Sequence, residues 1–126
     1  MKNVKHLNFN DGVISIYAVK NTAEDGERPN EVLSLKRKAR YENRSVGINR
    51  YYEAMQNNIK IAKVVVIPFY GGVDPLDVVI FCGDEGRQYR IEQVQQHTDT
   101  KPYTVRLSLS LLEQGYDMED TSNDAE

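Results

Sequence analysis

The densest group of residues able to do chemistry in this sequence is a basic segment. Six cations lie within fifteen positions and are opposed by Glu42 alone: Lys36, Arg37, Lys38, Arg40, Arg44 and Arg50. An exposed row of cations can meet phosphates without reading a base sequence. The rings of Tyr41, Tyr51 and Tyr52 are close enough in sequence to add base stacking. The alternative interpretation is a solvated strand face whose aromatic residues pack in a core, and the segment alone leaves both open.

Residues of catalytic type do not gather into a set. The single cysteine, Cys82, ends an apolar stretch, where a free thiol usually packs as a small hydrophobe, so we expect it to be buried and inert. His6 and His97 have polar neighbours in the sequence and are expected at the surface. No HxH, HExxH or EF-hand spacing is present. We therefore expect no enzymatic activity, no metal and no cofactor.

Two short motifs, Gly71-Gly72 and Asp84-Glu85, are most simply interpreted as turns. A phosphate-binding loop needs Lys-Ser or Lys-Thr after its glycines, whereas Gly71-Gly72 is followed by Val-Asp-Pro. Asp84 and Glu85 are adjacent carboxylates between two predicted strands, where water would solvate both. We expect both motifs to form turns.

The elements that must position these residues are mostly strands. Alternating or continuous apolar residues predict strands over residues 12–20, 32–46, 59–70, 76–82, 87–96 and 103–112. Apolar residues at spacings of three and four predict one short helix over residues 45–58. The alternation slips between Ile91 and Val94, which predicts a β-bulge near Glu92 and Gln93.

This pattern defines the fold class that we expect. It is mainly β, and it lacks the strand and helix alternation of a parallel sheet, so a small antiparallel β-barrel or a sandwich follows, with one short helix and long loops. A barrel of about six strands is favoured because closure removes the edge strands that invite uncontrolled pairing. The strongest strand patterns predict these core residues: Val64, Val66, Ile91, Leu107 and Leu109.

Length and charge predict one domain and a tail. A chain of 126 residues has room for one core, which we assign to residues 1–115. Residues 113–126 hold six acids and no base, and without these six acids the net charge changes from −3 to +3. Residues 116–126 are therefore predicted to be a disordered acidic tail whose deletion leaves the melting temperature nearly unchanged. No apolar stretch approaches the roughly 18 residues of a membrane span, and no secretory signal is recognised.

The order of elements in residues 45–112 carries a resemblance to a known family. The segment INRYYEAMQNNIK is followed by a Val/Ile strand, a second strand, a turn, QYRIEQV at residues 88–94, and the alternating TVRLSLSLL at residues 104–112. This order resembles the phage head-closure or head-tail joining proteins of long-tailed phages and prophages, also called stoppers. The likeness covers roughly residues 12–112 and depends on the order and spacing of elements, since none of these motifs is catalytic.

The resemblance implies a structural part of a virion. Such a subunit is a small β-barrel that forms a ring below the portal and its adaptor, helps to close the DNA channel of the filled head, and offers a platform for the tail. Its implied partners are portal and adaptor (connector) proteins, a tail-completion protein, further copies of itself and nearby packaged double-stranded DNA, with no membrane and no small-molecule substrate. The loops at residues 21–31 and 69–76 are the expected contact elements. The basic residues expected to face DNA or neighbouring subunits are Lys36, Lys38, Arg40, Arg44 and Arg50.

Two further expectations follow from this resemblance. The chain is expected in the host cytoplasm during assembly and then at the head-tail interface of the virion, or in a bacterial cytoplasm when a prophage encodes it. The isolated chain is expected to be mostly monomeric, because no coiled-coil heptads are visible in the sequence. The alternative function from another class is an OB-like module that binds single-stranded nucleic acid, which would use the same basic and tyrosine residues.

Overall fold

The computed structural model describes residues 9–23, 26, 28, 30–44, 60–99 and 101–119. The helix expected over residues 45–58 lies outside the described residues, as do Arg50 and His6. The described part contains these strands: β1 (Gly12–Asn21), β2 (Glu31–Asn43), β3 (Lys63–Pro68), β4 (Val78–Phe81), β5 (Tyr89–His97), β6 (Thr104–Leu111) and β7 (Asp117–Met118). The prediction of a mainly β chain is confirmed. None of the described residues forms a helix long and apolar enough to cross a membrane.

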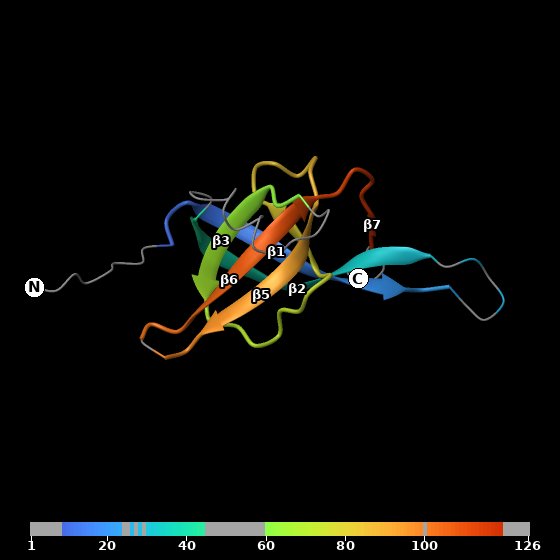
Figure 1. Cartoon of the computed structure of the whole chain (residues 1–126). Coiled ribbons are helices and arrows are strands. Elements are labelled where there is room, and N and C mark those ends of the chain that lie inside the picture. Colours follow the sequence, from blue (N-terminus) through green and yellow to red (C-terminus); the bar gives the residue numbers. More distant parts are fainter. Residues whose placement is uncertain are drawn as a thin grey trace, which may run out of the picture.

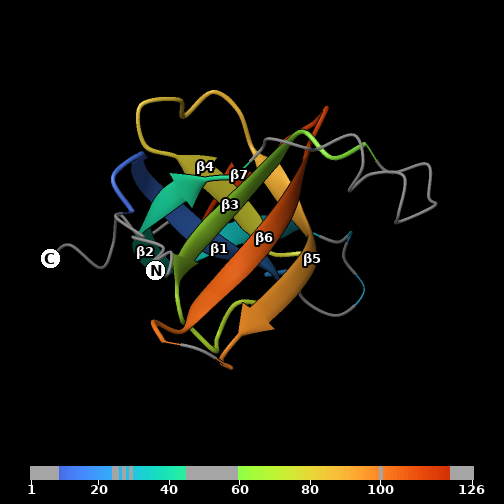
Figure 2. The ribbon, with the colours of Figure 1, turned by 60° about the vertical axis from the view of Figure 1, so that its left-hand side comes forward.

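Six of these strands close into a ring. Their order is β1-β4-β5-β6-β3-β2, and a further pairing between β2 and β1 completes the circuit. Every neighbouring pair in the ring is antiparallel. Figures 1 and 2 show the strands winding around a common interior. The expectation of a small, closed antiparallel β fold is therefore confirmed.

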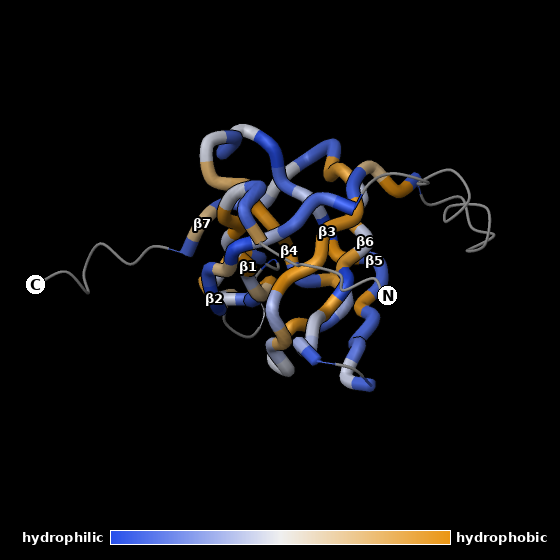
Figure 3. Tube along the Cα trace, turned by 90° about the vertical axis from the view of Figure 1, so that its left-hand side faces the viewer, coloured by the Kyte–Doolittle hydropathy of each residue, from blue (hydrophilic) through white to orange (hydrophobic). Residues whose placement is uncertain are grey.

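The interior of the ring is an apolar core. One cluster of buried side chains has members on β1, β3, β4, β5 and β6. Its fully buried members include Ile14, Val79, Ile91, Leu107 and Leu109. The five residues predicted for the core, from Val64 to Leu109, are all at most 5% exposed. In Figure 3, hydrophobic segments follow β3, β4 and β6, whereas the connections are largely hydrophilic. Burial on this scale, at about 25 cal/mol per Å² of apolar surface, is the main force that holds the ring together.

Two β-bulges break the regular alternation. The one predicted near Glu92 is confirmed, because the β5 to β6 register shifts between Ile91 and Gln93. The second lies in β2 and was not predicted: Ile16 faces Arg37 while Tyr17 faces Leu35, so the intervening Lys36 has no partner in β1. A residue inserted in this way moves the following side chains to the other face of the strand.

The bulge in β2 divides this strand between two clusters. On its far side, Ala39 and Tyr41 pack against the interior core. On its near side, Leu33 packs with Val78 and Ile80 in a second, outer cluster. β1 pairs with β4 only over Ile14–Tyr17, so the rest of the β1–β2 hairpin extends beyond the ring as an arm, which Figure 1 shows clearly.

The prediction of a disordered tail from residue 116 is wrong for residues 116–119. Tyr116 packs against the outer cluster, and its backbone N–H and C=O both bond the Gln88 side chain, at 2.7 and 2.8 Å. β7 then pairs in parallel with Val32 and Leu33 of β2. The Glu119 carboxylate accepts a hydrogen bond from Lys20 at 3.0 Å, which lowers the pKa of Glu119. The prediction used the acidic composition of the tail, which gives no information about these partners. Residues 120–126 lie outside the described part.

Comparison of two truncations tests this ordered segment. A chain ending at Gly115 loses the Gln88 hydrogen bonds, the Tyr116 contacts and the β7 pairing, whereas a chain ending at Glu119 keeps them. We expect the shorter chain to melt at least about 4 °C lower than the longer one, the shift that roughly 1 kcal/mol produces in a small domain. Equal melting temperatures by circular dichroism would show that residues 116–119 add no stability.

Candidate interaction groove beside strand β2

Lys36, the bulged residue of β2, is held by the connection between β3 and β4. Its ammonium donates to the Asp77 carboxylate at 2.6 Å, to Asp74 at 3.2 Å and to the Gly72 carbonyl at 2.8 Å. Asp77 is buried and also accepts the backbone N–H of Asp74 at 2.9 Å. Burial opposes the charge of Lys36, but the hydrogen bonds to the two carboxylates outweigh it and raise the pKa of Lys36. The positive charge of Lys36 is thus engaged within the fold.

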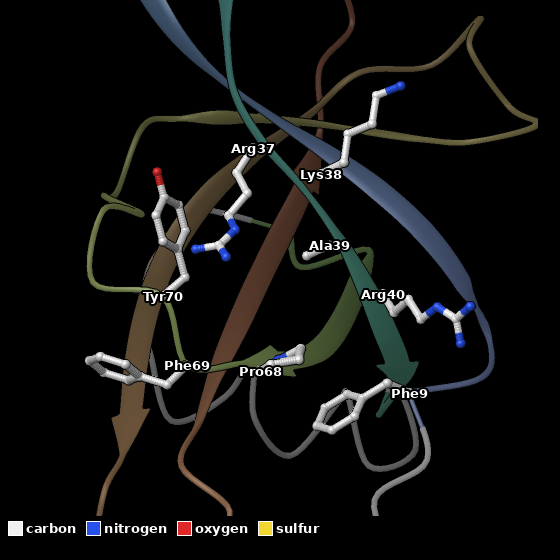
Figure 4. A pocket seen from close by; sticks show the side chains of 8 residues that line it. All are labelled: Phe9, Arg37, Lys38, Ala39, Arg40, Pro68, Phe69 and Tyr70. Atoms are coloured by element: carbon white, nitrogen blue, oxygen red, sulfur yellow. The ribbon is translucent and has the colours of Figure 1, made fainter.

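The remaining cations of β2 border a groove between this strand and the segment that follows β3. The groove has a volume of about 270 Å³ and is lined by Phe9, Arg37, Lys38, Ala39, Arg40, Pro68, Phe69 and Tyr70. Figure 4 shows Arg37 pointing toward Tyr70, while Lys38 and Arg40 point to the opposite side of β2. Lys38 and Arg40 are exposed, as the sequence predicts for that face.

Arg37 and two aromatic residues after β3 are members of this site that the sequence analysis did not select. The Arg37 guanidinium lies 4.7 Å from the centre of the Tyr70 ring, within the range of a cation–π interaction. Phe69 next to it is 42% exposed, so its ring is accessible from the groove. In the sequence, Arg37 alternates with the apolar residues Leu35 and Ala39, and this position does not mark it as a binding residue. For the aromatic residues, the available signal was the segment Pro-Phe-Tyr directly after the Val/Ile strand.

The backbone of β2 has an open edge along this groove. On one side, β2 pairs with β1 from Glu31 to Tyr41, with Lys36 bulged out of the pairing. On the other side, the described strands offer β7 beside Val32 and Leu33 and β3 beside Glu42 and Asn43. Between these contacts, residues 34–41, apart from the bulged Lys36, pair with β1 alone in the described part of the chain. As far as the chain is described, β2 and β3 are therefore paired only at Glu42 and Asn43 and are separated along the middle of β2.

Other residues expected in the basic site are used differently. Arg44 forms an ion pair with Glu42 at 3.2 Å, and both side chains are half-buried. Tyr41 packs against the core with its ring edge-on to Phe81, 5.1 Å between centroids. Burial and the nearby Asp11 carboxylate raise the pKa of Tyr41. Tyr41 is thus a core residue, which favours the structural interpretation of that ring over base stacking.

The residues considered for catalysis do not come together. The prediction that Cys82 is buried is wrong: it is exposed, because β4 ends at Phe81 and Cys82 begins the turn that follows. Glu85 in that turn accepts the N–H of Gly83 at 2.9 Å, and this hydrogen bond lowers the pKa of Glu85. Among the described residues, no group of three or more His, Cys, Asp and Glu side chains is arranged to hold a metal ion.

Comparison with known proteins gives a fold relationship. No protein-family model matches the sequence, and no curated protein matches it. Among solved structures, the chain is similar to the solution structure of protein SF1141 from Shigella flexneri 2a. The TM-score is 0.57 and the sequence identity 15%, and the alignment covers 90% of this chain and 100% of that chain. At this identity the likeness shows the fold alone.

Replacement of Lys36 by methionine tests its role in the fold. Lys36→Met leaves the buried Asp77 carboxylate without its cation, so we expect the free energy of unfolding to fall by about 1.5 to 3 kcal/mol. The matched control is Lys38→Met, two residues away and exposed, for which we expect a change below about 0.5 kcal/mol. Urea unfolding of both variants measures the difference, and equal stabilities would contradict a structural role for Lys36.

Proposed function

We propose that this chain is a structural subunit of the phage head-tail junction, which joins the DNA-filled head to the tail and helps to close the DNA channel as part of a ring. The observation that carries the proposal is the β1–β2 arm extending from a small closed β fold. This geometry fits a ring-forming part, which needs a rigid body and an element that reaches neighbours. The resemblance of residues 12–112 to head-closure proteins supports the same assignment.

The arm has the rigidity that a contact element needs. Its two strands pair from Tyr17 to Asn21 and from Glu31 to Leu35. Leu33 on one strand and Val19 on the other contact the outer cluster, so the base of the arm is packed against the body of the fold. A hairpin fixed at its base presents the far ends of its two strands, at Asn21 and Glu31, at a defined position beside the ring. Contacts made there would then depend little on the ordering of the hairpin itself.

Within such a ring, Lys38 and Arg40 are the cations best placed to meet DNA. Both are exposed on the outer face of β2, whereas Lys36 is held by Asp77 and Arg44 pairs with Glu42. Two or more cations per subunit, repeated around a ring, give a positive lining that attracts phosphates without sequence preference. DNA contact by Lys38 and Arg40 is therefore part of the proposal.

Addition of the purified protein to DNA-filled heads that lack it tests the proposal. We expect the wild-type chain to bind these heads, retain their DNA and permit tail attachment. The variant Lys38→Glu/Arg40→Glu is expected to bind heads but retain DNA poorly, because acidic side chains would repel the phosphates. Its matched control, Lys60→Glu/Arg87→Glu, makes the same charge change at exposed positions outside the groove and should behave as wild type. Analytical ultracentrifugation should find the free protein mostly monomeric.

Failure of the wild-type chain to bind heads or to prevent DNA leakage would overturn the proposal. A second function would then be favoured by a specific observation, the arginine stacked on Tyr70 beside the exposed Phe69. Aromatic rings next to cations on a closed β fold are what single-stranded nucleic-acid binders use. In that case the isolated monomer should bind oligothymidylate tightly, with an affinity that falls steeply as salt rises.

A further inference from the structure

Every second residue of β2 directs its backbone N–H and C=O groups toward the groove. The Arg44 N–H bonds Val64 of β3, and the Tyr41 carbonyl accepts the Asp11 N–H next to β1. Successive residues of an antiparallel strand direct their backbone groups to opposite sides. Counting back from Arg44, the N–H and C=O groups of Arg40 and Lys38 therefore face the groove, where the described strands provide no partner.

The same edge of β2 already accepts a strand. β7 adds to it in parallel beside Val32 and Leu33, and the Glu119 N–H donates to the Leu33 carbonyl at 2.8 Å. Residues 37–41 continue this edge beyond the bulge for about 16 Å at 3.3 Å per residue. Among the described strands, this stretch of β2 therefore has no partner on the edge where β7 pairs with Val32 and Leu33.

The side chains on either side of this edge differ sharply in chemistry. On the inner face, Ala39 and Arg37 border the groove of about 270 Å³, and the Arg37 guanidinium is held over the Tyr70 ring. The other walls include the apolar residues Phe9, Pro68 and Phe69. On the outer face, Lys38 and Arg40 are exposed and point away from it (Figure 4). Side chains directly opposite each other on paired strands lie about 4.5 to 5.5 Å apart between Cβ atoms. An added strand would meet a mainly apolar and aromatic surface around Ala39, bordered by Arg37, on one face, and the cations Lys38 and Arg40 on the other.

We propose that the open edge of β2, between the apolar groove at Ala39 and the cations Lys38 and Arg40, binds an extended segment of a partner protein in which acidic residues alternate with large apolar residues. The segment adds to β2 as a strand. Its acidic residues lie beside Lys38 and Arg40, and one apolar side chain enters the groove against Phe69. Main-chain hydrogen bonds supply affinity, and the two faces supply specificity. This inference does not require that the chain joins phage heads to tails. If it does, the segment and DNA are alternative occupants of Lys38 and Arg40.

A synthetic peptide of alternating glutamate and leucine or phenylalanine is the direct probe. Fluorescence anisotropy should show saturable binding to the full chain, and a peptide of the same composition with its acids in one block should bind at least about tenfold more weakly. Phe69→Ala should weaken binding about tenfold, whereas Leu111→Ala, which trims a similarly exposed apolar residue on β6, should leave it unchanged. Lys38→Glu/Arg40→Glu should abolish binding, and Lys60→Glu/Arg87→Glu should not.

Two methylated peptides distinguish strand addition from simple side-chain docking. N-methylation of every second amide removes the donors on one edge of the peptide, so one of the two possible registers should lose binding and the other should keep it. Equal binding of both peptides would overturn the strand-addition proposal. Binding of the blocked peptide as tightly as the alternating one would also overturn it, as would displacement of the peptide by oligothymidylate at lower concentration, which would assign the groove to nucleic acid.

Discussion

The ion pair between the Lys36 ammonium and the Asp77 carboxylate holds β2 at its bulge, the point where the strand passes from the outer cluster to the interior core. β2 must pack Leu33 into the outer cluster and Ala39 into the interior core, and a regular strand would place both side chains on one face. The bulge at Lys36 resolves this by changing the face. The displaced lysine would be costly to bury alone, and the two carboxylates and the Gly72 carbonyl satisfy its three donors.

The groove lies directly beyond the same bulge, beginning at Arg37. Past Lys36, β2 stays with β1 and rejoins β3 only at Glu42, so the ring parts along the middle of the strand. Arg37, brought to the inner face by the bulge, stacks on Tyr70 at the edge of this opening instead of entering the core. Along this middle stretch, the edge of β2 away from β1 is open among the described strands. Open edges of this kind in native proteins are usually protected by charge, and Lys38 and Arg40 provide it here.

Much of the fold followed from the sequence because one physical rule governed it. Strands that line an apolar interior show continuous or alternating apolar residues, and this rule located the ring strands, the buried Leu107 and Leu109, and the bulge after Ile91. The rule failed where a contact with a residue distant in the sequence determined the local structure. The bulge at Lys36 depends on Asp77, 41 positions away, and the order of Tyr116 depends on Gln88. Only part of the site could be predicted, for the same reason. The cations of β2 can be read from the sequence, but the open edge beside them depends on which strands pair with β2.

Amide hydrogen exchange along β2, followed by NMR in the isolated protein, tests the central claim most directly. If the edge is open, the amides of Lys38 and Arg40 should exchange quickly while those of Ala39 and Tyr41, which face β1, stay protected. Addition of the alternating acidic and apolar peptide should then protect Lys38 and Arg40. Slow exchange at Lys38 and Arg40 in the free protein, equal to that of Ala39 and Tyr41, would contradict the account.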